Sequence, residues 1–281
     1  MVPRQRSEGP AEAAARLTGR AVTGAGHTGS LGRVTLAGGA VAVVKYAPGA
    51  AAAEAAGLRW LADAGAVAVP RVHGADADWL VLDLVDASSP TTAAAETFGR
   101  ELAALHAAGA PSFGAPPPGG PADAWIGNAS MRNVPGDSWP QWYAEHRVLP
   151  YVRTAVDAGA LSSSEAAVIE RACARFPDTT EAPARLHGDL WNGNVLWSDR
   201  GAVLIDPAAH GGHRETDLAM LHLFGCPRLE RVVAAYHEAA PLADGYRERI
   251  PLHQLFPLLV HTVLFGRSYA AQAVAAARSL G

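Results

Sequence analysis

The chain has 281 residues, of which 49% are apolar and 18% are charged, and its formal net charge at pH 7 is −4. This length and apolar content are sufficient for one large domain or for two lobes around a cleft. Because binding of a phosphate backbone needs clustered Lys and Arg, the lack of a basic block argues against a nucleic-acid-binding protein.

No segment suggests secretion or a membrane anchor. Residues 1–8 are polar and lack the apolar stretch of a signal peptide. The longest apolar tract, Leu255 to Phe265, is too short to span a bilayer and predicts a buried helix. Cys173 and Cys226 fit no metal-ligand spacing, which favours two reduced cysteines over the alternative of one disulfide. We therefore expect a cytoplasmic protein with no membrane partner, and we expect a monomer.

The first third of the chain carries the signals of a small sheet. Short runs rich in Val flank the pair Gly38-Gly39, which favours a hairpin. A later run of Ala and Leu favours a helix. The predicted elements are a flexible glycine-rich loop over 24–32, strands over 33–36 and 40–46, a helix over 50–64, and strands over 69–73 and 79–85.

The remainder is predicted to be mostly helical, with a polar loop embedded in it. Ser162 is a suitable N-cap, and Glu165 three residues later completes a capping box. The pattern therefore predicts an α+β fold with two lobes: residues 1–86, a five-stranded antiparallel sheet plus one helix, and residues 87–281, a helical C-terminal lobe. The predicted elements are a helix over 91–108, a Pro- and Gly-rich loop over 109–135, helices over 139–158 and 162–176, short strands around a polar loop over 185–206, and helices from 215 onward.

The most informative segment is this polar loop. His187, Asp189, Leu190 and Asn194 match the kinase catalytic-loop spacing H-x-D-L-x-x-x-N. An alcohol is a poor nucleophile, and Asp189 could accept its hydrogen bond and finally its proton. For His187 we expect a structural role, bracing the loop.

Two oxygen-bearing side chains follow Asp189 at positions suited to magnesium. Asn194 offers an amide oxygen, and Asp206 offers a carboxylate at the end of an apolar strand, where protein kinases carry D-F-G. The alternative is a turn-rich hairpin with solvated Asp and Asn. Four positions in register, followed by an aspartate after a strand, favour the kinase interpretation.

The N-terminal part contains the residues that a kinase needs to hold ATP. Lys45 ends a strand, as the phosphate-binding lysine of kinases does, and Glu54 starts the next helix, where an ion pair would orient the ammonium. Asp83 and Leu84 would lie at the hinge, where backbone groups could bind the adenine edge. The glycines of residues 24–32 are weaker support, since they form no G-x-G-x-x-G motif.

At this point the residues resemble a known family. Residues 187–194 (HGDLWNGN) resemble the H-G-D-L-W-x-G-N signature of the fructosamine (ketosamine) kinases, a branch of the aminoglycoside and choline phosphotransferase-like kinases. Residues 213–220 (HRETDLAM) are similar to the H-R-E-x-D-L-A-M motif of that family, and residues 125–127 (WIG) to its F-I-G. The likeness extends from about residue 21 to residue 281.

The resemblance implies a protein-kinase-like fold, the cofactors ATP and Mg²⁺, and phosphorylation of a sugar hydroxyl of a ketosamine, which promotes deglycation. The substrate would be a fructosamine or ribulosamine, free or on a protein lysine. By the same resemblance Asp217 would brace the catalytic loop and Trp191 could stack on the substrate. His213 and Arg214 could contact substrate hydroxyls or, equally, brace the loop.

The sequence departs from the family at several places, among them a Pro- and Gly-rich segment over 115–121, and these departures bear on the identity of the substrate rather than on the fold or on phosphoryl transfer. His210 and Gly211 stand where the family often has two tyrosines, and residues 26–30 (GHTGS) lack the cysteine of many members. The alternatives are a kinase of another small alcohol, such as an aminoglycoside or choline, and a catalytically inactive kinase-like binding module. The presence of Lys45, Asp189 and both magnesium-ligand candidates argues against inactivity.

Overall fold

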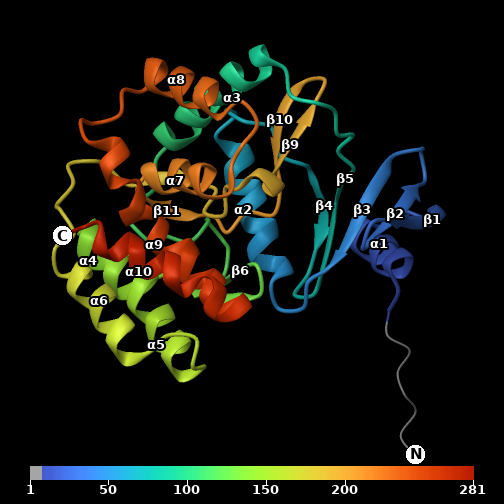
Figure 1. Ribbon diagram of the computed structural model, residues 1–281. Helices are drawn as coiled ribbons and strands as arrows, with labels where there is room; N and C mark the ends of the chain where they lie inside the picture. Colours follow the sequence, from blue (N-terminus) through green and yellow to red (C-terminus); the bar gives the residue numbers. More distant parts are fainter. Residues whose placement is uncertain (1–7) are drawn as a thin grey trace, which may run out of the picture.

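The computed structural model describes residues 8–281, with a strand-rich N-terminal part joined to a helical part (Figure 1). All neighbouring strands of the first sheet are antiparallel, in the order β1-β2-β3-β5-β4. These strands are β1 (Val22–Thr28), β2 (Leu31–Leu36), β3 (Val41–Tyr46), β4 (Val72–Ala75) and β5 (Trp79–Asp83).

Alternation along the strands places a helix against each face of this sheet. In β3, Val44 packs with the cluster that holds helix α1 (Pro10–Thr18), whereas Val43 packs with the cluster that holds helix α2 (Ala51–Asp63). Successive strand residues point to opposite faces, so one short strand supplies both clusters. Helix α1 was not anticipated, since the sequence suggested one helix here; Pro10 at its first turn was the available signal.

The glycine-rich segment 24–32 is not the flexible loop expected from composition. It forms most of β1 and the start of β2, around a turn at Gly29 and Ser30. Backbone hydrogen bonds to β2 need no side chains, so an exposed edge strand tolerates these glycines.

The helical part contains the remaining elements. The predicted helix over 139–158 forms with a π-helical turn at Ala144–Val148, and the capping box of Ser162 and Glu165 is present. The helices are α3 (Thr92–Ala107), α4 (Trp139–Tyr143), α5 (Leu149–Asp157), α6 (Ser163–Cys173), α7 (Glu215–Phe224), α8 (Leu229–Ala239), α9 (Tyr246–Phe265) and α10 (Ala270–Arg278).

Three two-stranded ribbons lie among these helices. The segment 109–135 was expected to be a loop, but it contains a hairpin of β6 (Asp123–Ile126) and β7 (Ala129–Arg132). Inward Ala124 and Ile126 alternate with outward neighbours, a signal too short to stand out from the prolines around it. The other ribbons pair β8 (Ala184–Leu186) with β11 (His210–Gly212), and β9 (Val195–Ser198) with β10 (Gly201–Leu204).

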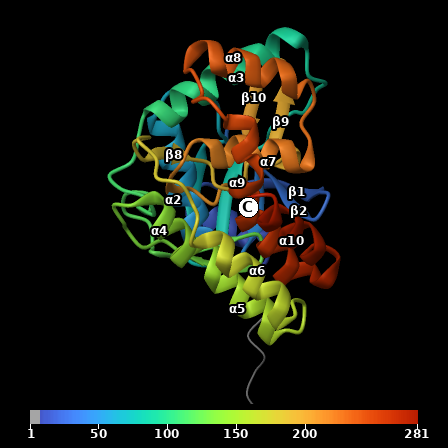
Figure 2. The same cartoon turned by 60° about the vertical axis from the view of Figure 1, so that its left-hand side comes forward.

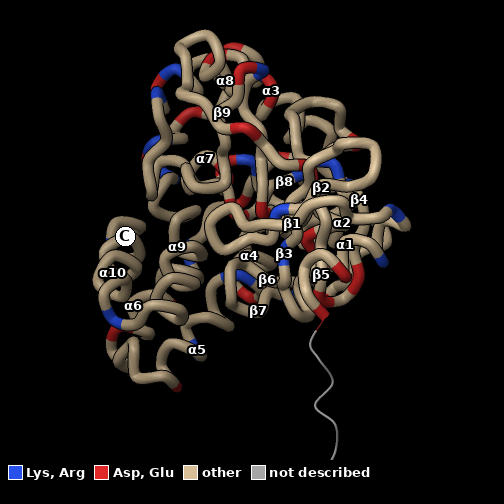
Figure 3. Tube along the Cα trace, turned by 90° about the vertical axis from the view of Figure 1, so that its right-hand side faces the viewer, with Lys and Arg blue, Asp and Glu red and all other residues tan. Residues whose placement is uncertain are grey.

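Figure 2 shows α3 and α8 together at one end of the helical part and α5, α6 and α10 at the other. The apolar tract at 255–265 lies in α9, as a mostly buried helix. In the part of the chain from residue 8 on, no helix has the length and apolarity needed to cross a bilayer. Basic positions in this part are dispersed over many elements (Figure 3).

The close packing of α3 on α8 depends on Gly99. A Cβ atom there would overlap the carbonyl oxygen of Val232 and lie 3.0 Å from the Cβ of Ala235. In an exposed helix, Gly→Ala would stabilise by about 1 kcal/mol. Here we expect Gly99→Ala to lower the free energy of unfolding by about 1–3 kcal/mol, since overpacking forces the helices apart. Urea denaturation measures this, and a gain in stability would contradict the packing described.

Candidate active site

A cleft of about 500 Å³ lies between the sheet and the helical part. Its floor carries Lys45, Glu54, Asp189, Asn194 and Asp206, five of the residues singled out in the sequence. They come from β3, α2, the catalytic loop and the segment after β10. The fold therefore brings together groups separated by as many as 161 positions in the chain.

Asp189 is held by the residue five positions further on. The side-chain amide of Asn194 donates to the Asp189 carbonyl oxygen at 2.8 Å and to its carboxylate at 3.1 Å. Burial raises the pKa of Asp189 to about 7, opposed by the Asn194 hydrogen bond and reinforced by the charges of Asp206 and Asp217. A carboxyl with such a pKa is suited to exchanging a proton near neutral pH.

The donor set around Asp189 fits a hard divalent cation. Because the amide nitrogen of Asn194 is engaged by Asp189, its amide oxygen is the atom left to bind a metal. Asp206 adds a carboxylate whose side chain is 45% exposed in the cleft. A hydrogen bond from the Ile205 amide to the Asn194 carbonyl, at 3.1 Å, ties the two segments together.

Asp206 has an unusual backbone conformation. Its φ is +53°, although it is not glycine and precedes Pro207, a position that favours extended backbone. Backbone strain of this kind, about 1–3 kcal/mol, persists where the surroundings hold the residue in place. Here the ammonium of Lys45 contacts the Asp206 carboxylate at 3.0 Å.

Lys45 connects the two parts of the molecule. Its ammonium lies 2.8 Å from Glu54 and 3.0 Å from Asp206, so the Lys45–Glu54 ion pair expected from the sequence is present. Burial alone would lower the pKa of Lys45, but the charges of Glu54 and Asp206 outweigh it and raise that pKa. The lysine is therefore charged and points toward the cleft floor.

The catalytic loop is braced from α7. The Asp217 carboxylate, 1% exposed, accepts from the amides of His187 at 2.8 Å and Gly188 at 2.9 Å. His106 donates its Nε2–H to Asp217 at 3.2 Å and accepts from the hydroxyl of Tyr236 at 2.8 Å. The loop backbone is thus fixed by a buried chain of hydrogen bonds.

His187 and Gly188 each suit this loop for a separate reason. The His187 ring donates Nε2–H to the Ile205 carbonyl at 2.9 Å and accepts from the Asp189 amide at 3.3 Å. Gly188 has a φ of +82°, and a Cβ there would overlap the carbonyl oxygen of Ala208. Only glycine can adopt this positive φ and also allow the Ala208 carbonyl to lie so close.

Several predicted site residues do not reach the cleft. The Asp83 amide donates to the Arg71 carbonyl at 3.1 Å and its carboxylate meets His73 at 2.6 Å, so Asp83 is occupied within the sheet. Leu84 directly follows β5 and is half-buried outside the cleft lining.

His213 and Arg214 are also outside the cleft lining. The Arg214 guanidinium binds Glu181 at 2.7 Å and the backbone carbonyl of Pro241 at 2.7 Å. His213 is buried, and its Nε2 lies 3.1 Å from the hydroxyl of Thr179. Of the two roles weighed for these residues, this placement is against substrate contact and agrees with a structural one.

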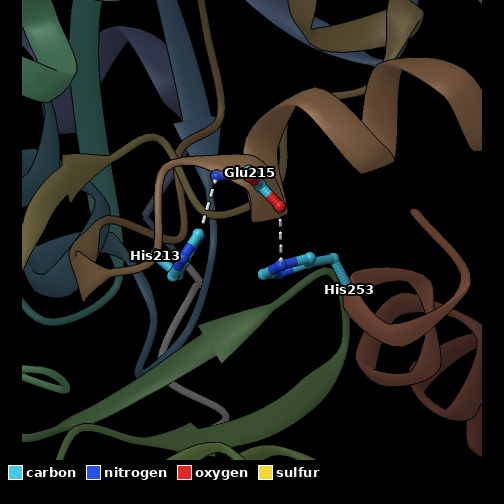
Figure 4. Close-up of side chains that lie close together, drawn as sticks. All are labelled: His213, Glu215 and His253. Atoms are coloured by element: carbon cyan, nitrogen blue, oxygen red, sulfur yellow. Dashed lines mark hydrogen bonds and ion pairs between the residues drawn. The ribbon is translucent and has the colours of Figure 1, made fainter. Parts of the chain in front are cut away.

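His213 belongs to a buried cluster with Glu215 and His253 (Figure 4). Three such ligands could suggest a metal centre. However, Arg249 donates to both carboxylate oxygens of Glu215, and both ring nitrogens of His213 already have partners. A cation would have to displace these bonds beside a guanidinium, so the cluster acts as a structural anchor for α7.

Several residues that line the cleft were not expected from the sequence. Tyr46 follows Lys45, and His261 and Phe265 lie near the end of α9. Trp125 was noted only as part of a motif, yet its indole N–H donates to the Gly49 carbonyl at 3.2 Å, across the cleft. The position of Tyr46 beside the lysine was a usable signal, whereas nothing in the sequence indicated Phe265.

Comparison with known proteins decides the family. A sequence profile described as fructosamine kinase matches residues 45–280. The chain belongs to the fructosamine kinase family. A relative in Thermus thermophilus, named a probable ketoamine kinase, is 36% identical over 86% of this chain and 88% of its own. The chloroplastic protein-ribulosamine 3-kinase of Arabidopsis thaliana is 30% identical over 79% of this chain and 69% of its own.

Solved structures agree with this placement. A crystal structure from Thermobifida fusca, assigned as a fructosamine-3-kinase, is 51% identical and superposes with a TM-score of 0.88 over 96% of this chain and 97% of that one. An aminoglycoside phosphotransferase bound to ADP and hygromycin B shares the fold alone, with 14% identity and a TM-score of 0.61 over 96% of this chain and 98% of that one. The fold is thus the two-lobed kinase-like α+β fold, and membership of this family makes the protein a kinase, a phosphotransferase that uses ATP.

Removing the charge of Asp217 tests the brace. In Asp217→Asn one oxygen becomes an amide that faces backbone donors, so we expect the free energy of unfolding to fall by about 3 kcal/mol. Thermal or urea denaturation measures this change. Asp244→Asn, at an exposed position, is the matched control and should be neutral. Equal stability of the two variants would show that the loop does not depend on this carboxylate.

Proposed function

We propose that this protein transfers the γ-phosphate of ATP to a sugar hydroxyl of a ketosamine, free or attached to a protein lysine. The observation that carries the proposal is the position of Asp189 in the cleft, 3.1 Å from Asn194 and with a pKa near 7. Phosphorylation would destabilise the sugar–amine adduct, so deglycation is the expected outcome.

In this proposal each residue on the cleft floor has a distinct task. Asp189 accepts the hydrogen bond of the substrate hydroxyl and finally its proton, as the hydroxyl oxygen bonds to the γ-phosphorus of ATP and the bond from that phosphorus to the bridging oxygen breaks to release ADP. Lys45, oriented by Glu54, positions the phosphates of ATP. Asn194 and Asp206 would hold Mg²⁺, which supplies positive charge that offsets the charge on the transferring phosphoryl group.

The proposal also includes the position of the hinge between the two lobes. We place the boundary between the lobes near residue 86, in the extended segment between β5 and α3. The Asp83 amide donates to the Arg71 carbonyl and Leu84 lies outside the lining of the cleft, so contact of these two residues with the adenine edge stays a prediction from the sequence. The cytoplasmic location and the monomeric state stay predictions from the sequence.

The cleft lining disfavours a polycationic antibiotic as substrate. Its carboxylates are Glu54, Asp189 and Asp206, all on the catalytic floor, and two of them already contact Lys45. An aminoglycoside with several ammonium groups would need further acidic partners in the cleft.

A substrate panel tests this assignment. We expect Mg²⁺-dependent ADP release with fructosyl-lysine or ribulosyl-lysine held within a peptide, and none above background with choline or kanamycin. Turnover on choline or kanamycin alone would keep the phosphotransferase and overturn the substrate class. ATP binding without turnover on any of them would argue against the proposed function itself.

Replacing the base tests the role of Asp189. Asp189→Asn keeps the shape but cannot take up the proton, so kcat should fall by about 10²–10⁴-fold. Binding of ATP, followed by fluorescence titration, should change little, because the lysine and its carboxylate partners remain. Asp199→Asn, in the exposed turn between β9 and β10, is the control and should retain full activity. Unchanged turnover in Asp189→Asn would exclude this residue as the base.

A further inference from the structure

Exposed aromatic side chains gather at the mouth of the active-site cleft. In residues 8–281 the large apolar side chains that are exposed are Tyr46 (60%), Phe265 (63%), Trp191 (40%) and Trp125 (37%). All four line the cleft. Exposed apolar groups that gather at one place, rather than scatter singly, mark a binding surface. We call these four residues the aromatic rim.

The aromatic rim is built from four separate segments and is held in place. Trp125, in β6, is anchored to the Gly49 carbonyl at 3.2 Å. Trp191 meets Phe224 edge to face, with 6.2 Å between ring centres, and the Phe265 ring lies 5.4 Å from that of His261. An ordered apolar surface loses little conformational entropy when it binds a ligand.

The charged residues that line the cleft are those already assigned to its catalytic centre. The Asp, Glu, Lys and Arg residues that line it are Lys45, Glu54, Asp189 and Asp206. The single cation among them, Lys45, is already engaged by two carboxylates. A negatively charged group on the outer part of a substrate would therefore lose hydration without gaining a positive partner.

His261 is a second feature of the cleft that disfavours a negatively charged group on the substrate. Its Nδ1 lies 2.8 Å from the Pro257 carbonyl, which can only accept, so Nδ1 carries the proton and donates. In the neutral ring Nε2 is then an acceptor, and burial lowers the pKa of His261, which favours that neutral form. A lone pair at Nε2 suits an N–H or O–H of the substrate and repels a carboxylate.

We propose that this cleft selects ketosamines whose amine substituent is uncharged and apolar, aromatic above all, and discriminates against those that carry a carboxylate. The inference rests on the proposed function, because the sugar must reach Asp189 for the amine substituent to lie at the aromatic rim. The protonated secondary amine of the ketosamine itself is acceptable there, since aromatic faces attract cations. The same chemistry occurs in small aromatic amines and in lysines whose carboxyl group is part of a peptide bond.

Matched substrates separate charge from size. The fructosyl adducts of phenylalaninamide and glycinamide would be compared with those of phenylalanine and glycine, by kcat/KM for ADP release. We expect each amide to exceed its acid by about tenfold or more, and phenylalaninamide to exceed glycinamide by about tenfold or more. Equal values for acid and amide, or a preference for the acid, would overturn the proposal.

A peptide-like substrate distinguishes the two sources of this chemistry. The fructosyl adduct at Nε of Nα-acetyl-lysine methylamide is uncharged apart from its secondary amine. A kcat/KM equal to or above that of the phenylalaninamide adduct would support glycated peptides as the source, and a lower value would support small aromatic amines. No turnover on any of the five adducts would instead overturn the proposed function, and this inference with it.

Variants at Phe265 test whether the aromatic rim is responsible. Phe265→Ala should reduce the preference of phenylalaninamide over glycinamide severalfold, and Phe265→Arg should raise kcat/KM for the phenylalanine adduct about tenfold by providing a cation. Val263→Ala, on the same helix but outside the cleft lining, is the control and should leave both ratios unchanged. An unaltered acid-to-amide ratio in Phe265→Arg, with the KM for ATP preserved, would contradict the proposal.

Discussion

The buried carboxylate of Asp217 is the interaction on which the active site depends. It is stable there only because two loop amides and His106 donate to it, since an unpaired buried charge would be very costly. A loop with a positive φ at Gly188 cannot satisfy these amides through a regular strand ladder. The acceptor from α7 replaces that ladder and fixes the direction in which Asp189 enters the cleft.

Lys45 ties the two lobes together through ion pairs, as Asp217 holds the catalytic loop through hydrogen bonds. Its ammonium bridges Glu54 in the N-terminal lobe and Asp206 after β10, so the position of one lobe affects the metal-ligand candidate of the other. The positive φ of Asp206 shows that its carboxylate is directed to this place against the local backbone preference. Strain at this residue is consistent with a functional requirement rather than a requirement of the fold.

Local spacing made the centre of the site predictable, and long-range packing made its surroundings unpredictable. The interval from Asp189 to Asn194 reflects one tight loop, and Lys45 and Glu54 are separated by one strand end and one helix start, so a linear pattern preserves both. By contrast, the edge strand β1 and the hairpin of β6 and β7 form through backbone pairing, which glycine and proline composition conceals. His213 packs against His253, which is far along the chain, and no local pattern indicates this contact.

The cleft combines a charged floor with an aromatic mouth, and the aromatic mouth suits the chemistry of the floor. A charged floor is effective in phosphoryl transfer only where water is excluded, because electrostatic interactions weaken in a solvated site. Aromatic rings at the mouth, such as Trp125 and Phe265, present apolar surface for a bound substrate to cover, without adding charges that would compete with Lys45 for the phosphates. The same choice of residues leaves the outer cleft without a partner for an anion. Selection against charged amine substituents is therefore a direct consequence of how the floor is protected, and it requires no separate recognition element.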